Sequence, residues 1–358
     1  MDIFVAIIIY SLCLIFRKSK WLTIVSFIFL WTLWGWNTWN GDYDSYEKVY
    51  YDSFYENTEF SNTEFGYIWL VRFFYGLGFT FQEFMIIISG IILSINLYFT
   101  LKLSKYPALY SFFYFFIFVM EFVFIRNYIA DTLLLLAFLI GFNNKKFSKL
   151  IAISIVLLAS TVHYTALIYL LFLYPFYLKK TFNLSKSVIF FLGMMFLSSI
   201  SLTFILPFLG QNYISKLSYY TSDSFWLISI AHLLMVVGVV MFFERLKVAL
   251  INIDKSWLYL FNFIINLNII SLFYLSLYYH VPYFSRVLKL LLAINTIVIL
   301  SSFCLVRGKN LIKKLTIPVL LFFALFFVYY SKTNFPFTIT PLFKCNIIWG
   351  DEFYIPEQ

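Results

Sequence analysis

The chain has 358 residues, of which 62% are hydrophobic and only 12% are charged, and its formal net charge is +9 at pH 7. Soluble domains carry about 25% charged residues, so this composition excludes a soluble globular protein and indicates a polytopic membrane protein. A positive net charge often indicates nucleic-acid binding. Here the basic residues form short clusters between apolar runs, as in cytoplasmic membrane loops. We therefore exclude nucleic acid as a partner.

Apolar runs recur along the whole chain and predict an all-α fold that forms a single integral membrane domain, residues 1–358. A helix needs about 20 apolar residues to cross roughly 30 Å of hydrocarbon. On this basis we predict about twelve transmembrane segments, near residues 2–16, 21–39, 81–100, 108–125, 127–142, 148–162, 164–178, 187–209, 225–243, 257–279, 287–306 and 315–330.

The basic clusters fix the predicted orientation of these segments. If Arg17, Lys18 and Lys20 lie inside, the N-terminus lies outside, and the later loops alternate so that most of the 26 lysines and arginines lie inside. The positive-inside rule favours this asymmetry. The acidic loop 40–80 and the C-terminal tail 331–358 are then both expected on the outer side.

The longest polar segment before the tail is residues 40–72, which holds seven of the 17 carboxylates. Its tyrosines Tyr43, Tyr46 and Tyr50 have helical spacing and predict an aromatic face on a short helix. Such a face serves either as an interfacial anchor or as a platform on which sugar rings stack. The predicted surface is therefore acidic and lined by tyrosine.

Two further features of this loop bear on function. Asp42 and Asp44 form a D-x-D pair, which in soluble sugar transferases holds a metal-bound nucleotide. This pair faces away from the cytoplasm, so we expect it to accept sugar hydroxyls or a proton, without a metal or another cofactor. Residues 65–80 carry one charge, Arg72, and predict a helix at the outer interface. There Arg72 either binds an anion or extends to the interface.

Arg126 lies between two apolar runs at their predicted outer ends. A charge at the centre of a membrane helix costs about 2.5–3.5 kcal/mol on insertion scales, so Arg126 requires a partner. One hypothesis is a bound anion. The other is a structural ion pair with Glu121 or Asp131.

Residues 147–178 form either one long span or a hairpin of two short spans. One span would put three later basic clusters outside, so we favour the hairpin. Each arm has about 15 residues, or roughly 23 Å at 1.5 Å per residue, which is too short to cross fully. The apex, His163, is then expected on the floor of an outward cavity, where imidazole suits proton transfer. A hydrogen-bonded core histidine is the alternative.

Arg286 and Lys289 are three residues apart and share one face at the start of an apolar helix. They are either an ordinary helix-end cluster or part of an anion site. Together with Arg72 and Arg126 they predict an outward cavity, in which guanidinium groups hold phosphate through bidentate hydrogen bonds. A lipid-linked pyrophosphate is the natural ligand for such a cavity.

Other polar residues inside the apolar runs are expected to be structural. The three cysteines show no disulfide framework, and the histidines lack partners at zinc-ligand spacing. Three asparagines could form polar contacts between helices: Asn262, Asn266 and Asn295.

Several segments occur in a distinctive order, namely GDYDSY, TEFGY, RNYIADTLLLLAF and HYTALIYLLFLYPF, followed by PYFSRVLKLLL and the tail motif TPLFK. Together they resemble the EpsG-like branch of Wzy-type polysaccharide polymerases. The resemblance covers residues 40–178 well and the rest loosely. It implies functional roles for Arg126, His163 and Arg286. Tyr164 within HYTA and Lys344 in the tail motif are further candidates for substrate binding.

The resemblance implies a membrane glycosyltransferase on the outer side of the bacterial plasma membrane. It would join oligosaccharide repeat units carried on undecaprenyl pyrophosphate, the donor and acceptor, to form O-antigen, capsule or exopolysaccharide. A membrane lipid environment, a flippase and a chain-length regulator are the implied partners. We expect the arginines and Lys289 to neutralise the leaving pyrophosphate, and Asp44, Glu64 or His163 to deprotonate the attacking hydroxyl. One-step displacement would invert the anomeric centre.

Two alternative functions remain open at this stage. A lipid-linked glycan ligase or another lipid-phosphosugar transferase would share the cations but use another acceptor. A flippase or transporter would need polar residues that continue into the cytoplasmic half. The predicted concentration of ionisable residues in the outer half argues against transport.

Overall fold

The computed structural model describes residues 2–54, 63–142, 146–178, 180–182, 225–250, 253–275, 285–305 and 336–350, with isolated positions between them such as Tyr278. The segments predicted near 187–209 and 315–330 lie almost wholly outside the described residues. Within the described part, the chain is helical, and β-pairing is limited to one bridge between Asn37 and Asn346. An all-α fold is therefore observed, as predicted.

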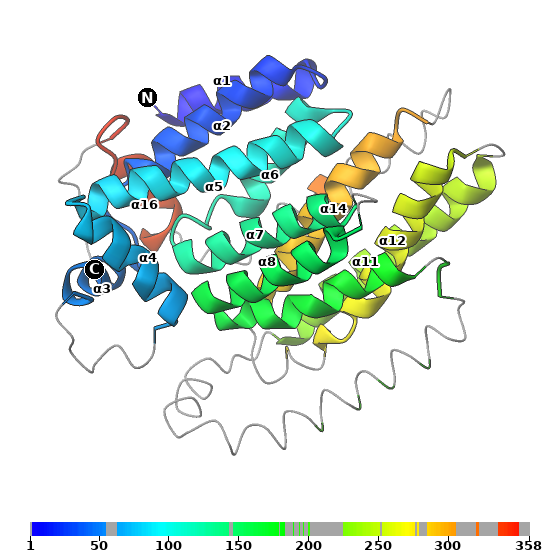
Figure 1. The fold of residues 1–358 in the computed structure, drawn as a ribbon. Coiled ribbons are helices and arrows are strands. Elements are labelled where there is room, and N and C mark those ends of the chain that lie inside the picture. Colours follow the sequence, from blue (N-terminus) through cyan, green and yellow to red (C-terminus); the bar gives the residue numbers. More distant parts are fainter. Residues whose placement is uncertain are drawn as a thin grey trace. The chain divides into compact units, whose positions relative to one another are not determined.

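The chain divides into two compact units, residues 1–170 with 296–358, and residues 171–295. The first unit contains α1 Asp2–Ile15, α2 Lys20–Gly35, α3 Tyr43–Asp52, α4 Phe65–Gly76, α5 Phe81–Leu103, α6 Pro107–Phe118, α7 Ile125–Gly141, α8 Ser148–Val162 and α16 Ile339–Lys344 (Figure 1). Most of the longer helices match the predicted segments closely, but α6 ends at Phe118, before the predicted boundary at residue 125. The two short helices α3 and α4 lie where the sequence predicts helices in the polar loop.

Local sequence signals set several helix ends. Thr80 and Glu83 form a capping box at the start of α5, and Ser19 accepts a hydrogen bond from Leu22 N at the start of α2. Pro107 occupies the first turn of α6, where its missing N–H costs nothing. Helix α2 ends at Gly35, earlier than the predicted boundary at residue 39.

Close backbone contacts hold α2 against α5. A Cβ atom on Gly35 would lie 2.9 Å from Ser89 Oγ, and one on Gly90 would lie 3.0 Å from Trp31 Nε1. The indole of Trp31 donates a hydrogen bond to Ile86 O at 2.9 Å. Small residues thus allow the two helices to approach, as in many membrane helix pairs.

The predicted tyrosine-lined surface is wrong for Tyr46 and Tyr50, because both side chains are buried. Tyr50 is fully buried, its ring packs on Phe81 and Phe84, and its hydroxyl donates to Phe79 O at 2.7 Å. Tyr46 is also buried. These rings therefore attach α3 to α4 and α5, because the aromatic face of an amphipathic helix is the face it buries.

The interruption predicted at His163 is present. Helix α8 ends at Val162, His163 has an extended backbone with φ −151° and ψ 111°, and a 3-10 helix, η2, spans Tyr164–Tyr177. The two arms therefore have 15 and 14 residues. The second arm is 3-10 helical rather than α-helical, and its membrane orientation stays a prediction.

The second unit contains α11 Phe225–Ala249, α12 Lys255–Ser271 and most of α14 Ser285–Ser302. Asn268 on α12 and Asn295 on α14 exchange two side-chain hydrogen bonds of 2.8 and 2.9 Å. His232 on α11 is buried, with its ring nitrogens 2.8 Å from Tyr278 Oη and Ser271 Oγ. The polar contacts expected for Asn295 are confirmed, and His232 lies in a structural hydrogen-bond network, as predicted.

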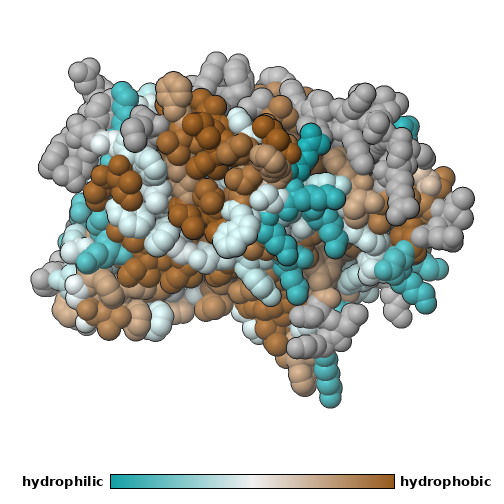
Figure 2. Space-filling model, turned by 90° about the horizontal axis from the view of Figure 1, so that it is seen from above, coloured by the Kyte–Doolittle hydropathy of each residue, from teal (hydrophilic) through white to brown (hydrophobic). Residues whose placement is uncertain are grey.

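Large apolar side chains remain exposed on several helices. Helix α1 exposes Ile3, Phe4, Ile7 and Ile8, and apolar surface is prominent on the face shown in Figure 2. Among the described residues, two helices, Phe81–Leu103 and Leu227–Ala249, are long and apolar enough by themselves to cross a bilayer. Several other apolar helices have only 10–17 residues. Exposed apolar patches on this scale indicate contact with lipid.

Candidate active site at Glu64, Arg126 and His163

Glu64 lies at the centre of a cluster drawn from three separate parts of the first unit. Its Oε2 accepts a hydrogen bond from Arg126 Nη1 at 2.6 Å, and its Oε1 lies 3.1 Å from His163 Nδ1. The backbone N–H of Tyr164 also points to Oε1, at 3.4 Å. Residues that are 62 and 99 positions away from Glu64 thus meet at one carboxylate.

Each member of the cluster lies where a helix begins or ends. Glu64 is the N-cap of α4, Arg126 is in the first turn of α7, and His163 follows the last residue of α8. The short helix α4 packs on α8, and α7 also packs on α8. The cluster therefore forms where these three helices end near one another.

Gly66 permits the close approach that brings Glu64 to His163. A Cβ atom at this position would overlap Thr161, both at Oγ1 and at the backbone carbonyl group. Thr161 lies two residues before His163 on the last turn of α8. A side chain at position 66 would therefore push α4 away from α8.

Opposing effects act on the pKa of Glu64. Burial of its side chain, which is 8% exposed, raises the pKa, while the hydrogen bond from His163 and the charge of Arg126 lower it more. The net effect lowers the pKa from about 4.5 to about 2. Glu64 is therefore an ionised acceptor at neutral pH, and a weak base.

The guanidinium of Arg126 is also held by aromatic rings. Its Cζ lies 5.5 Å from the ring centroid of Tyr46 and 5.7 Å from that of Tyr67, which fits cation–π contacts. Its side chain stays 28% exposed, and Nε donates to no acceptor among the described residues. Arg126 thus keeps donor capacity beyond its pair with Glu64.

The alternative partners predicted for Arg126 belong to a separate contact. Glu121 and Asp131 are both buried, and the amide of Asn127 donates to Glu121 Oε2 and to Asp131 Oδ2, each at 3.2 Å. Arg126 is paired with Glu64 instead. The chain turns through 119–124 before α7, which places Arg126 and Asn127 on different sides of the new helix.

The other predicted residues of the polar loop have different surroundings. Asp44 is exposed in the first turn of α3, and Asp42 is its partly exposed N-cap residue. Tyr43 donates to Gln82 Oε1 at 3.2 Å. Arg72 is exposed, and its Nε donates to Ser53 O at 2.6 Å, which ties α4 to the end of α3. Within the described residues, no three metal-binding side chains gather at one place.

The remaining predicted residues lie on other elements. Tyr164 is exposed and contacts the cluster through its backbone, and Lys344 is exposed at the end of α16. Arg286 and Lys289 are partly buried in the first turns of α14, within the second unit. Their convergence with Arg126 stays a prediction.

The sequence did not reveal the roles of three residues: Gly66 and Tyr67 in the Glu64 cluster, and Asn127 in the neighbouring contact. Gly66 and Tyr67 belong to the TEFGY segment, so the segment was noticed but their roles were not assigned. Glycine signals close approach only when its neighbour is known. The position of Thr161 therefore had to come from the structure.

Comparison with known proteins identifies the family. No curated protein and no solved structure matches the chain. The model of the EpsG family matches residues 20–343, which include Glu64, Arg126, His163 and Arg286. The apolar helices of the chain and this family match together indicate a membrane protein of polysaccharide biosynthesis. The chain belongs to the EpsG family, whose members are polysaccharide polymerase-like proteins.

Proposed function

We propose that this protein polymerises lipid-linked oligosaccharide repeat units on the outer face of the plasma membrane. The donor is the growing chain on a polyprenyl pyrophosphate, and the acceptor is a hydroxyl group of an incoming repeat unit. Membership in the EpsG family supports a membrane glycosyltransferase. The observation that carries the proposal is Glu64 held between Arg126 and His163.

His163 is the general base in this proposal. An ionised carboxylate only accepts hydrogen bonds, so His163 Nδ1 donates to Glu64. In neutral imidazole, Nε2 then carries the lone pair that takes the proton from the attacking hydroxyl. Glu64 orients the ring and stabilises the imidazolium, as carboxylates do in nucleophile–histidine–carboxylate triads. This role suits Glu64 better than direct proton transfer because its pKa is lowered to about 2.

Arg126 is the electrophilic group. The sugar hydroxyl forms the new glycosidic bond as the bond from the anomeric carbon to the pyrophosphate oxygen breaks, and negative charge collects on the leaving group. The exposed part of the Arg126 guanidinium would face this charge, and fixed guanidinium groups stabilise phosphate more strongly than water does. Direct displacement inverts the anomeric centre.

The remaining cations and carboxylates have supporting roles in the proposal. Arg286 and Lys289 would hold the second phosphate, with Arg72 nearer the interface. Asp42, Asp44, Tyr43 and Tyr164 would contact sugar hydroxyls from the partly exposed end of α3 and the start of η2. The proposed chemistry takes place between two lipid-linked substrates and uses no cofactor.

The test is a reaction of purified protein with the lipid-linked repeat unit alone. A polymerase produces a ladder of products that differ by one repeat, and it releases polyprenyl pyrophosphate. A ligase gives product only when a different acceptor is added, and a flippase only moves the substrate across a bilayer. Either of these latter outcomes, with folded protein, would overturn the proposal.

A further inference from the structure

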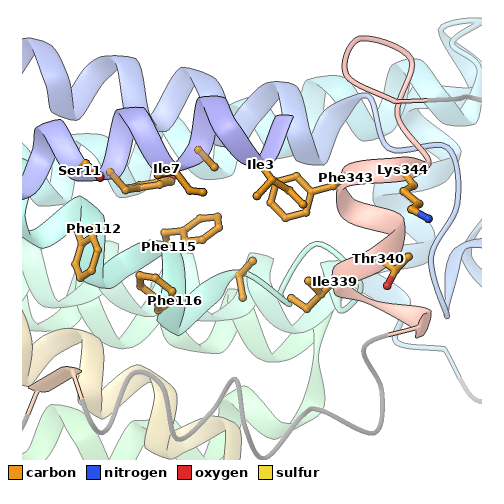
Figure 3. A pocket seen from close by; sticks show the side chains of 13 residues that line it. Ile3, Ile7, Ser11, Phe112, Phe115, Phe116, Ile339, Thr340, Phe343 and Lys344 are labelled. Carbon is orange, nitrogen blue, oxygen red and sulfur yellow. The ribbon is translucent and has the colours of Figure 1, made fainter. Parts of the chain in front are cut away.

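An elongated apolar groove lies between α1, α6 and α16, with a volume of about 570 Å³ (Figure 3). This volume is within the roughly 300–1,000 Å³ of small-ligand pockets. Every residue that lines the groove belongs to the first unit. The groove is separate from the residues of the Glu64 cluster.

The lining follows one face of each long helix. Ile3, Ala6, Ile7 and Tyr10 recur at helical spacing on α1, and α6 contributes Phe112, Phe115 and Phe116. The span from Ile3 to Ser11 is roughly 12 Å at 1.5 Å rise per residue. Such a wall offers few hydrogen-bonding groups, so its occupant is a hydrocarbon chain rather than a sugar.

The two ends of the groove differ. Ser11 and Phe112 lie at one end, while Ile3 and Phe343 lie towards the other, where Lys344 extends away from the apolar side chains (Figure 3). Lys344 is exposed. A chain bound along the groove would therefore place an anionic headgroup at the Lys344 end, where an ammonium group attracts phosphate.

Residues that line the groove or lie next to it are close in sequence, or hydrogen-bonded, to segments of the proposed active site. Val119 lines the groove and precedes Arg126 by seven residues, so their Cα atoms are at most about 25 Å apart. Phe337, just before α16, accepts a hydrogen bond from Gly41 N at 2.9 Å, and Asn37 Nδ2 donates to Cys345 O at 2.8 Å. Both contacts lie just before the start of α3, and α3 contains Tyr46, whose ring contacts Arg126.

We propose that this groove binds the polyprenyl chain of the lipid-linked substrate, with its phosphate end at Lys344. The inference rests on the proposed function, because the groove serves polymerisation only if the headgroup that it anchors reacts at Arg126. The groove would hold the first part of the chain, and the rest would extend into the surrounding bilayer. Its volume suits one hydrocarbon chain better than the two chains of a phospholipid.

The experiment measures binding of undecaprenyl phosphate to the full-length purified protein by native mass spectrometry in detergent. Ile7→Trp fills the groove, and Ile8→Trp is the matched control, since both isoleucines lie on α1 and are 57% exposed but only Ile7 lines the groove. We expect Ile7→Trp to weaken binding roughly tenfold or more, with Ile8→Trp within about twofold of the parent. Lys344→Ala should weaken binding about fivefold, and Lys344→Arg should restore most of it.

Competition separates the carrier from bulk lipid. Equimolar phosphatidylglycerol should leave most of the undecaprenyl phosphate bound. Equal weakening by Ile7→Trp and Ile8→Trp, or displacement by phosphatidylglycerol, would overturn the groove assignment. The same preparations are then assayed for the product ladder. A missing ladder with groove-dependent binding refutes the polymerase proposal alone, while a ladder without groove-dependent binding refutes the groove alone.

Discussion

Arg126 and Asn127 are neighbours in α7, yet they lie in two polar clusters of different character. Arg126 is charged, partly exposed and paired with Glu64, which also contacts His163. Asn127 is 2% exposed and links the buried carboxyl groups of Glu121 and Asp131. Consecutive helical residues point about 100° apart, so one helix turn supplies both clusters.

The difference shows which cluster is suited to bind a ligand. The partly exposed Arg126 can exchange a carboxylate for a phosphate, because both are anions that accept from a guanidinium. Asn127 donates to one oxygen of each of two buried carboxyl groups, and this cluster leaves little surface for a ligand. We therefore expect substitutions in the first cluster to reduce activity and those in the second to reduce stability.

Replacing Arg126 should give the largest effect. Arg126→Ala removes the charge proposed to face the leaving pyrophosphate, and we expect ladder formation to fall roughly 10³-fold or more, as for arginines in phosphoryl transfer. Arg126→Lys keeps the charge but loses the planar fork, and should recover only a small part. Product ladders at matched amounts of folded protein give the measurement. Near-parent activity of Arg126→Ala would contradict the expectation that the cluster of Arg126, Glu64 and His163 is needed for activity.

His163→Asn tests the general base. The shorter amide can still donate towards Glu64 but cannot accept a proton, so activity should fall about 10²- to 10⁴-fold. The melting temperature should change little, because the contact with Glu64 is kept. Turnover of the lipid-linked substrate and a thermal melt are measured on the same preparation. A small loss of turnover would assign the base to another residue, such as Asp44.

Gly66→Ala tests how the first cluster is assembled. The added methyl group overlaps Thr161 and should shift α4, and displacement of a catalytic group by about 1 Å can cost roughly 10²-fold in rate. Gly76→Ala is the matched control on the same helix, since its Cβ would meet nothing within 4 Å. Ladder assays of the two variants should differ clearly. Equal activities would show that the close approach is unnecessary.

Asn127→Ala tests the second cluster. It leaves two buried carboxyl groups without their amide donor, which should cost about 1–3 kcal/mol in the free energy of unfolding. Thermal melts should show a lower melting temperature than the parent. Activity per folded molecule should stay within about threefold of the parent. A large loss of turnover in protein that remains folded would place Asn127 with the catalytic residues.

The pH dependence of stability tests the lowered pKa of Glu64, and its expected effect is the smallest of these predictions. Its folded-state pKa of about 2 lies below the usual value of about 4.5, so its ionised form contributes stability above about pH 4.5 that is lost as the pH falls towards 2. Glu64→Gln removes this contribution. The difference in melting temperature between the parent and this variant should shrink as the pH falls from about 4.5 towards 2. A difference that grows over this range would contradict the lowered pKa.

The sequence by itself determined the membrane class, the all-helical fold and most helix boundaries. Long apolar runs, Pro107 and the Thr80–Glu83 capping box are local signals, and local signals can be read without knowing the rest of the fold. The break at His163 and the importance of Arg126 were predicted in the same way, from apolar arms too short to cross and from a charge in an apolar setting.

Only the tertiary structure decided the partners of these residues. One of the two hypotheses for Arg126 was an ion pair with nearby Glu121 or Asp131, but it pairs with Glu64 because Gly66 lets α4 approach Thr161. Tyr46 and Tyr50 were expected on a surface, but α3 buries that face against α4 and α5. Contacts across 62 or 99 residues depend on helix packing, which helical periodicity does not specify.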